Sequence, residues 1–408
     1  MGKGFGICDQ GENMKRLIYI AMGEAWLKKA HSIQTFHTCE YLAKENEIEV
    51  VYPLTPINYR NRKETKKFYE NSNLELKFIP KTFFSSFLTL LSLPGKYFFY
   101  ILDRLVFSFF SLLYLLGSDK DMIFTKDPVI AFFFTIFRKF HGKKIIYEIH
   151  KLEHIQFEEA SPIVRMLLKG MEIKALKNSD YLVTISTWLK KYADRFNRNV
   201  LFLPDGFDSK IFKPRDRNVS RKKLGIPREY KILMYSGASF RHGVGDLVLS
   251  MKIFGKNENI RLYLVGGLLK EIRKFKRISR ELNLGNMIVF VGSVSHERVP
   301  DYLNASDLLV LPYSRNKFTE YFSSPLKLFE YMAVKKPIIA TRVGCFKGIL
   351  KHEENTLLVE PDSPEALSRG IRRILNNKKL AAKIAKNAYK DSEKYTYKKR
   401  AGKISDLL

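Results

Sequence analysis

Short apolar runs alternate with longer and more polar segments along nearly the whole chain, and this alternation restricts the possible folds most. In the first half, runs with the length of buried strands lie at residues 15–22, 48–52, 122–125, 144–148, 181–185 and 200–203. The second half repeats the pattern at 231–235, 261–265, 288–291, 308–311, 337–340 and 357–359. Strands separated by helical lengths of chain form parallel sheets with helices on both faces. The sequence therefore predicts an α/β fold with two doubly wound parallel sheets, and ligands at the carboxyl ends of the strands.

The length agrees with two domains, because 408 residues suffice for two full-sized cores. Turn-forming residues gather at 204–214, with the sequence PDGFDSKIFKP, and mark the joint. We expect an N-terminal domain over residues 14–204 and a C-terminal domain over residues 205–390.

The formal charge of +29 predicts contact with polyanions, such as nucleoside diphosphates, anionic lipid headgroups or nucleic acid. A generally lysine-rich composition is the simpler explanation for part of this excess. The three cysteines, Cys8, Cys39 and Cys345, have no metal-ligand spacing, and residues 1–13 lack the apolar core of a signal peptide. These features favour a cytoplasmic protein.

A helix-start pattern followed by an isolated carboxylate stands at SSPLKLFEYMA, residues 323–333. Ser324 suits the N-cap and Pro325 the first helical position, and Leu326 and Phe329 then share an apolar face. Glu330 lies within that face, where a carboxylate is costly unless it is hydrogen-bonded. A diphosphate at the helix start and sugar hydroxyls on Glu330 fit a nucleotide-sugar. The simpler alternative is an ordinary capped helix with a surface glutamate.

This segment resembles the donor site of the retaining GT-B glycosyltransferases, described as group 1 or family 4-like glycosyltransferases. In that family a Glu-x7-Glu pattern lies here, and its second glutamate, which Glu330 matches, holds the ribose hydroxyls. Phe322 stands at the position of the first glutamate, so that contact is absent or supplied by another group. The resemblance implies the GT-B architecture, in which two Rossmann-like domains face each other across a cleft.

The resemblance spans nearly the whole chain. Residues 204–208, Pro-Asp-Gly-Phe-Asp, are similar to the interdomain Pro-Asn-Gly-Val-Asp signature of the family. Tyr395-Thr396-Tyr397 lies where the family has an aromatic pair before a last helix. The family therefore implies that residues 391–408 form a helix that packs back on the N-terminal domain.

The catalytic candidates are His150, Arg241, Lys327 and Glu330. His150 follows an apolar strand, and the resemblance implies that it faces the donor sugar, although a lone histidine there is more often structural. The family's diphosphate-binding arginine and lysine are replaced by Ala238 and His242, so we expect Arg241 and Lys327 to supply the cations.

The donor-binding candidates lie in two loops and one helix start. They are Gly23, His31, Gly237, His242, Ser324, Leu326 and Glu330. The loop from Gly23 to His31 leads into a predicted helix, and a solvated basic loop is an equally good interpretation there. No cofactor and no metal is expected. Asp119-Lys120-Asp121 has a metal-binding spacing, but it precedes a strand and is read as a solvated turn.

Two aromatic-rich stretches, Phe83–Leu93 and Leu105–Leu116, are shorter than the roughly 20 residues that span a bilayer. Asp103 and Arg104 are expected to interrupt any longer apolar helix. With the basic cluster of Arg60 to Lys67, these stretches predict peripheral contact with an anionic membrane. Buried helices beneath a basic surface are the alternative.

The expected activity is transfer of a hexose from a UDP- or GDP-sugar, with retention. The acceptor would be a glycan or a lipid-linked acceptor in cell-surface polysaccharide or glycolipid synthesis, at the inner face of the membrane. No nucleic-acid partner is expected. Two alternatives remain at this point: a nucleotide-sugar epimerase of similar fold, and a polyanion- or nucleic-acid-binding protein.

Overall fold

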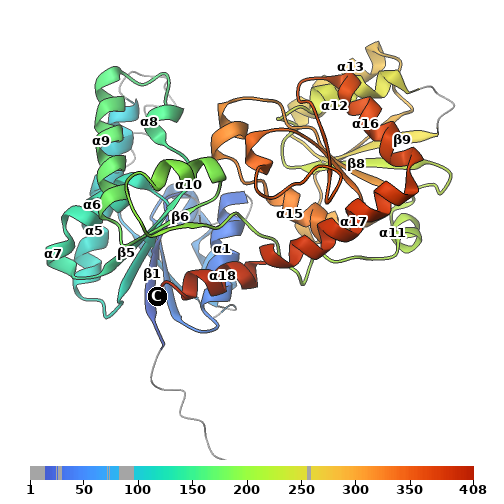
Figure 1. Ribbon diagram of the computed structural model, residues 1–408. Coiled ribbons are helices and arrows are strands. Elements are labelled where there is room, and N and C mark those ends of the chain that lie inside the picture. The colour runs from blue at the N-terminus through green and yellow to red at the C-terminus, as the bar shows by residue number, and fades with distance from the viewer. Residues whose placement is uncertain are drawn as a thin grey trace, which may run out of the picture. The chain divides into compact units, whose positions relative to one another are not determined.

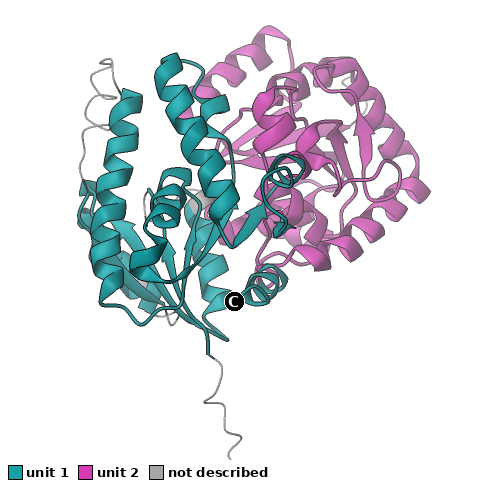
Figure 2. Cartoon of the chain, turned by 60° about the vertical axis from the view of Figure 1, so that its left-hand side comes forward, with its two compact units in different colours: residues 1–185, 189–203, 398–408 teal, residues 186–188, 204–397 magenta. Residues whose placement is uncertain are grey.

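The computed structural model describes residues 14–23, 25, 30–70, 72, 74–81, 96–254 and 259–408 (Figure 1). The chain divides into two compact units (Figure 2). Unit 1 comprises residues 1–185, 189–203 and 398–408, and unit 2 comprises residues 186–188 and 204–397. The main segment of unit 2 begins at Pro204, where the turn-rich segment also begins. Its last helix starts at Tyr397 rather than at residue 391.

Unit 1 contains a seven-stranded parallel sheet in the order β3-β2-β1-β4-β5-β6-β7. The strands are β1 Arg16–Ile20, β2 Glu47–Pro53, β3 Glu75–Ile79, β4 Met122–Thr125, β5 Lys144–Ile149, β6 Tyr181–Thr184 and β7 Val200–Phe202. The sequence pattern does not predict β3, because its charged residues make it less apolar than the neighbouring strands. The order reverses between β1 and β4, which is where such sheets bind ligands.

Helices cover both faces of this sheet. They are α1 Ala30–Leu42, α2 Pro56–Arg60, α3 Arg62–Glu70, α5 Lys96–Leu116, α6 Pro128–Ile136, α7 Arg138–His141, α8 Glu153–Gln156, α9 Pro162–Asn178, α10 Thr187–Ala193 and α18 Tyr397–Ser405. Phe107 of α5 packs in one core cluster with Val51 of β2. Tyr69 of α3 contacts the next residue of that strand, Tyr52, with hydroxyls 3.2 Å apart. Successive strand residues point to opposite faces, so α3 and α5 lie on opposite sides of the sheet.

Helix α5 runs without a break for 21 residues, so the predicted interruption at Asp103 and Arg104 is wrong. Arg104 is held by Asp127, with 2.6 Å between Nε and Oδ2, and Lys81 lies 4.0 Å from the fully buried Asp103. Paired in this way, the two charges stay inside the helix. The first apolar stretch, Phe83–Leu93, lies outside the described residues.

A buried ion pair fastens the C-terminal helix α18 within unit 1. Arg400 donates to Glu148 of β5, with 2.7 Å between Nη2 and Oε1, and the two residues are 2% and 0% exposed. Gln34 of α1 also donates to this carboxylate, at 3.3 Å. Burial alone would raise the pKa of Glu148, but the charges of Arg400, Lys126 and His150 hold that pKa well below its ordinary value. The carboxylate is therefore ionised. It connects three segments that are distant in sequence, namely α1, β5 and α18.

Unit 2 contains a six-stranded parallel sheet in the order β10-β9-β8-β11-β12-β13. The strands are β8 Lys231–Gly237, β9 Ile260–Gly266, β10 Ile288–Gly292, β11 Leu308–Leu311, β12 Ile338–Thr341 and β13 Leu357–Val359, each overlapping a predicted run. The helices include α11 Arg217–Leu224, α12 Val244–Ser250, α13 Leu269–Glu281, α14 Val299–Ala305, α15 Leu326–Ala333, α16 Pro364–Asn376 and α17 Lys378–Ser392. The described residues of this unit also form a π-helix, η4 Phe318–Phe322, and the short 3-10 helices η1 Met251–Ile253, η3 His296–Arg298, η5 Gly344–Phe346 and η6 Glu393–Tyr395. Here the strand order reverses between β8 and β11.

The first and last residues of the main unit 2 segment, near Phe207 and Tyr395, form backbone hydrogen bonds with each other. The amide of Phe207 donates to the carbonyl of Tyr395 at 3.1 Å, and the amide of Tyr397 donates to the carbonyl of Phe207 at 3.0 Å. A Cβ on Gly206 would lie 2.6 Å from the Tyr395 carbonyl oxygen. Only glycine therefore allows this approach, which explains the residue in the turn signature.

Replacing Arg400 by alanine should lower the free energy of unfolding by about 3–5 kcal/mol, because Glu148 would remain buried without its main partner. Urea unfolding measures the loss. Lys403→Ala, which removes an exposed charge from the same helix, should change stability by about 0.5 kcal/mol or less. Equal stabilities of the two variants would show that the pair does not hold α18.

Candidate functional site

The carboxyl end of β8 and the start of α15 meet at the point where the unit 2 sheet reverses. Lys327 of α15 donates to the hydroxyl of Tyr235 in β8 at 2.8 Å, and its ammonium lies 4.3 Å from the ring centroid. A Cβ on Gly237 would lie 2.6 Å from the same Nζ atom. The amide of Ser236 donates to the buried hydroxyl of Tyr331 at 2.7 Å. The predicted residues Gly237 and Lys327 are thus brought together.

The start of α15 differs from the prediction by one residue. The helix begins at Leu326, which is partly exposed, and Pro325 is its N-cap and provides no side-chain cap. The hydroxyl of Ser324 instead accepts the amide of Asp205 at 2.9 Å. A π-helix, η4 Phe318–Phe322, precedes it and was not predicted. The N-cap role predicted for Ser324 is therefore wrong, and no described side chain caps the first turn.

Burial dominates the electrostatics of Lys327. It lowers the pKa of the ammonium to about 8, although the nearby charge of Glu330 acts in the opposite direction. An ammonium with this environment gains stability from an added anion, because the anion replaces lost hydration. Lys327 is the cation that the geometry places at the end of β8.

His242 lies between two aromatic rings. Its ring centroid is 5.3 Å from that of Tyr313 and 5.7 Å from that of Phe318, with interplanar angles of 3° and 16°. Burial, and then the charges of Lys327 and Arg241, lower the pKa of His242. An uncharged imidazole is therefore favoured at neutral pH, in place of the lysine that the family pattern has here.

The loop between β8 and α12 is fixed by contacts that the sequence reading missed. Glu271 of α13 accepts from the Ser239 hydroxyl at 2.8 Å and from the Phe240 amide at 2.9 Å. Gly243 has φ of +81°, and a Cβ there would lie 1.6 Å from the Pro312 carbonyl oxygen. Arg241 of this loop is exposed and forms no ion pair with any residue that the structure describes. Its role as a diphosphate ligand stays a prediction.

Glu330 has a partner that the sequence did not reveal. Its Oε1 atom lies 3.0 Å from Nε2 of His296, at the start of η3 after β10, and Glu330 is only 8% exposed. The stretch around His296 is polar and has no regular pattern, so nothing in it distinguishes this histidine. A protein side chain thus supplies a hydrogen bond that a carboxylate in an apolar face needs. The predicted contact of Glu330 with sugar hydroxyls stays a prediction.

The unit 1 candidates lie at the ends of β1 and β5. His150 follows β5, with Nε2 2.5 Å from Oε1 of Glu148, the carboxylate that also holds the C-terminal helix. Gly23 follows β1 with φ of +118°, and its carbonyl accepts from Asn58 at 3.0 Å. The backbone of His31 lies in α1, but its side chain lies outside the described part.

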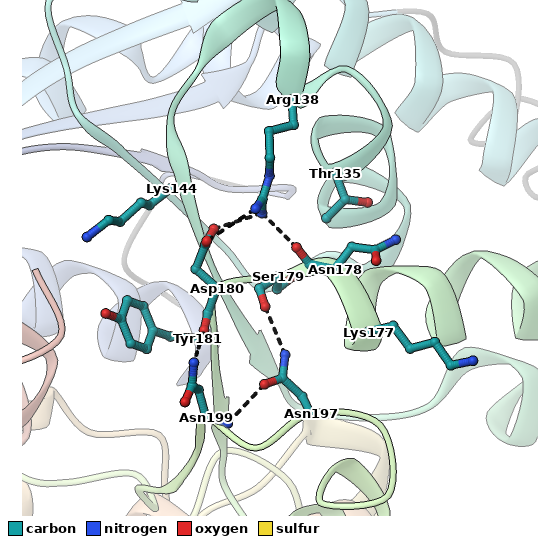
Figure 3. Close-up of a pocket in the computed structure, with 10 residues that line it drawn as sticks. All are labelled: Thr135, Arg138, Lys144, Lys177, Asn178, Ser179, Asp180, Tyr181, Asn197 and Asn199. Carbon is teal, nitrogen blue, oxygen red and sulfur yellow. Dashed lines mark hydrogen bonds and ion pairs between the residues drawn. The ribbon is translucent and has the colours of Figure 1, made fainter.

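A cavity of about 690 Å³ opens at the opposite end of the unit 1 strands, near the amino ends of β5 and β6 (Figure 3). Arg138 pairs with Asp180 at 2.8 Å, and Asn197 donates to the Ser179 carbonyl at 2.8 Å. Figure 3 shows Arg138 bonded to the Asp180 side chain, and Asn197 and Asn199 bonded to backbone groups of their neighbours. Most of these polar groups are bonded within the protein, and the cavity lies at the amino ends of the strands, where ligands are not expected. We therefore regard this cavity as structural.

The predicted turn at Asp119 and Asp121 has an internal partner. Arg16 at the start of β1 pairs with both carboxylates, at 2.8 Å and 3.3 Å. The two aspartates are exposed at the amino end of β4, at the same edge as the structural cavity.

Unit 2 is similar to a known family of proteins. Residues 216–391, which lie within unit 2, match the family model of glycosyl transferases group 1. An uncharacterized glycosyltransferase of Methanocaldococcus jannaschii is 24% identical over 298 residues, which cover 69% of this chain and 74% of the relative. A D-inositol 3-phosphate glycosyltransferase of Nocardioides sp. is 23% identical over 50% of this chain and 46% of its own length. The chain thus spans about half of that second relative.

Solved structures resemble the chain over nearly its whole length. Sucrose-phosphate synthase from Thermosynechococcus elongatus superposes with a TM-score of 0.72, at 20% identity, covering 96% of this chain and 98% of that one. Anabaena HepE in complex with UDP gives a TM-score of 0.73, at 15% identity, covering 96% and 99%. Two Rossmann-like units with these structural neighbours define a protein of the GT-B fold. Within this fold, residues 216–391 are similar to the glycosyl transferases group 1.

Proposed function

We propose that the protein transfers a hexose from a UDP- or GDP-sugar to a glycan or lipid-linked acceptor, with retention at the anomeric carbon. The observation that carries this proposal is the presence of both Lys327 and Glu330 on α15, with Lys327 bonded to Tyr235 at the end of β8. The ammonium and the uncapped helix start suit a diphosphate, and the carboxylate suits ribose hydroxyls. Anabaena HepE, a structural neighbour, was solved with UDP and with UDP-glucose.

In the proposed reaction the acceptor hydroxyl attacks the anomeric carbon from the face that the diphosphate leaves. The bond from that carbon to the diphosphate breaks, and a diphosphate oxygen takes the proton of the hydroxyl. Lys327, Arg241 and the α15 dipole stabilise the charge of the leaving group, so the proposal requires neither a metal nor a protein nucleophile. His150 would bind a hydroxyl of the transferred sugar.

We further propose that unit 1 contacts an anionic membrane through α5 and α7, presenting a lipid-linked acceptor at the cytoplasmic face. α5 is long and apolar enough to cross a membrane, but 39% of its apolar 18-residue stretch is buried inside the protein. Its opposite flank is exposed at Phe109, Leu113 and Leu116, and Phe140 of α7 is 70% exposed. A core helix with one apolar exposed flank fits interfacial binding. The basic cluster of α3 lies on the other side of the sheet, so it does not border this surface.

Glu330→Ala should weaken binding of UDP or GDP about tenfold or more, because charge-assisted hydrogen bonds contribute about 1.5–3 kcal/mol. Calorimetry in the presence of EDTA measures this. Glu281→Ala, which removes an exposed glutamate of the same unit, should have no effect. Unchanged affinity in Glu330→Ala would remove this residue from the site. Binding that requires added magnesium or manganese would contradict the metal-independent mechanism.

Nucleoside diphosphate binding should take up a proton at pH 8–9. The pKa of Lys327 is about 8 in the free protein, and a bound diphosphate raises it, so affinity falls as pH rises above 8. Calorimetry in buffers of different ionisation enthalpy counts the protons. Lys327→Met should abolish the uptake. Lys336→Met is the matched control, since burial also lowers the pKa of Lys336 to about 8. Undiminished uptake in Lys327→Met would assign the proton to another group.

The protein should float with anionic vesicles at low salt. Basic residues near the surface contribute about 1 kcal/mol each over a Debye length of about 8 Å at physiological salt, so flotation should decline as salt rises. Leu113→Asp combined with Phe140→Asp should abolish flotation. Neutralising Arg62, Lys63, Lys66 and Lys67 of α3 should weaken it less. If the wild type stays in solution at low salt, a soluble acceptor is the better interpretation.

A further inference from the structure

We propose that His296 is a positioning residue for donor binding: it holds one oxygen of Glu330 so that the other remains directed at the ribose hydroxyls. This inference rests on the proposed function, in which Glu330 binds the donor. It assigns a role to a side chain that lies outside the loops and the helix predicted to form the site.

The surroundings of Glu330 create the need for such a partner. Its neighbours on α15, Phe329 and Tyr331, are fully buried, and a carboxylate among them is unfavourable without hydrogen bonds. Nε2 of His296 lies 3.0 Å from Oε1. The second oxygen, Oε2, forms no hydrogen bond with any residue that the structure describes. One oxygen is thus bound by the protein, and the other is available to a ligand.

His296 is itself held in place. Its ring packs edge-on against the buried Phe212, with centroids 5.1 Å apart and an interplanar angle of 61°. Burial would lower the pKa of His296, but the hydrogen bond and charge of Glu330, with Glu297 and Asp208, raise it. A donor proton on Nε2 is therefore favoured. A fixed ring that donates to the carboxylate selects one orientation of Glu330 before the ligand arrives.

This arrangement reduces the cost of binding. A carboxylate that must be ordered by the ligand loses rotamer freedom at that moment, whereas a preorganised one does not. The effect should appear in recognition of the ribose hydroxyls and not in binding of the diphosphate. Comparing a ribonucleotide with its 2′-deoxy analogue therefore separates positioning from a general structural role.

The experiment measures affinity for UDP, GDP and their 2′-deoxy analogues by calorimetry. The proteins are wild type, His296→Ala, His296→Gln, Glu330→Ala and the double alanine variant. We expect His296→Ala to weaken ribonucleotide binding about tenfold and to reduce ribose-to-deoxyribose discrimination. His296→Gln, which retains an N–H donor, should recover part of the ribonucleotide affinity and part of the ribose-to-deoxyribose discrimination. In the Glu330→Ala background, His296→Ala should have no further effect.

His352→Ala is the matched control, because it removes another His–Glu pair of unit 2, with 3.3 Å between Nε2 and Glu353 Oε1. It should bind nucleotides as the wild type does. The proposal is overturned if Glu330→Ala weakens nucleotide binding but His296→Ala does not. It is also overturned if His296→Ala lowers nucleotide affinity by the same factor in the wild-type and Glu330→Ala proteins. If Glu330→Ala binds nucleotides normally, Glu330 is not part of the donor site, and this inference fails with that part of the proposed function.

Discussion

A buried carboxylate must be neutralised or hydrogen-bonded, and this requirement organises much of the molecule. Glu148 recruits Arg400 and so fixes the last helix of the chain in unit 1. Asp127 binds Arg104 and allows α5 to pass through two charged residues without a break. Glu330 binds His296 at the candidate site. In each case the partner lies far away in sequence, so a local polar residue determines a long-range contact.

The candidate site departs from the family pattern in a physically consistent way. The loop after β8 lacks the usual arginine and lysine, and His242 occupies the lysine position between two aromatic rings. In the proposed function the cation comes instead from α15, where Lys327 donates to the hydroxyl of Tyr235. Burial lowers the pKa of Lys327 to about 8, so this ammonium loses its proton more readily than an exposed lysine does. A diphosphate would then stabilise the charge that binds it, which couples donor binding to protonation.

The apolar surface of unit 1 shows how topology limits a hypothesis. From the sequence, the basic cluster of Arg60 to Lys67 and the aromatic stretches were expected to act together at a membrane. Tyr52 and Val51 point to opposite faces of β2, and they contact α3 and α5 respectively. The two features therefore lie on different sides of the sheet. Membrane contact through α5 has to rely on its own apolar flank and on α7.

By itself the sequence determined the features that depend on neighbours along the chain. These are the two parallel sheets, all six strands of unit 2, the helix that carries Glu330, and the need of that carboxylate for a partner. Only the tertiary structure decided who the partners are. His296, Arg400 and Glu271 meet their partners across strands and helices, and no local pattern marks them. The tertiary structure also determined where helices begin. The local sequence predicts Ser324 as the N-cap of α15, but the Ser324 hydroxyl accepts a hydrogen bond from the Asp205 amide instead. Local propensity is short-ranged, whereas the pairing of buried polar groups depends on which elements the fold brings together.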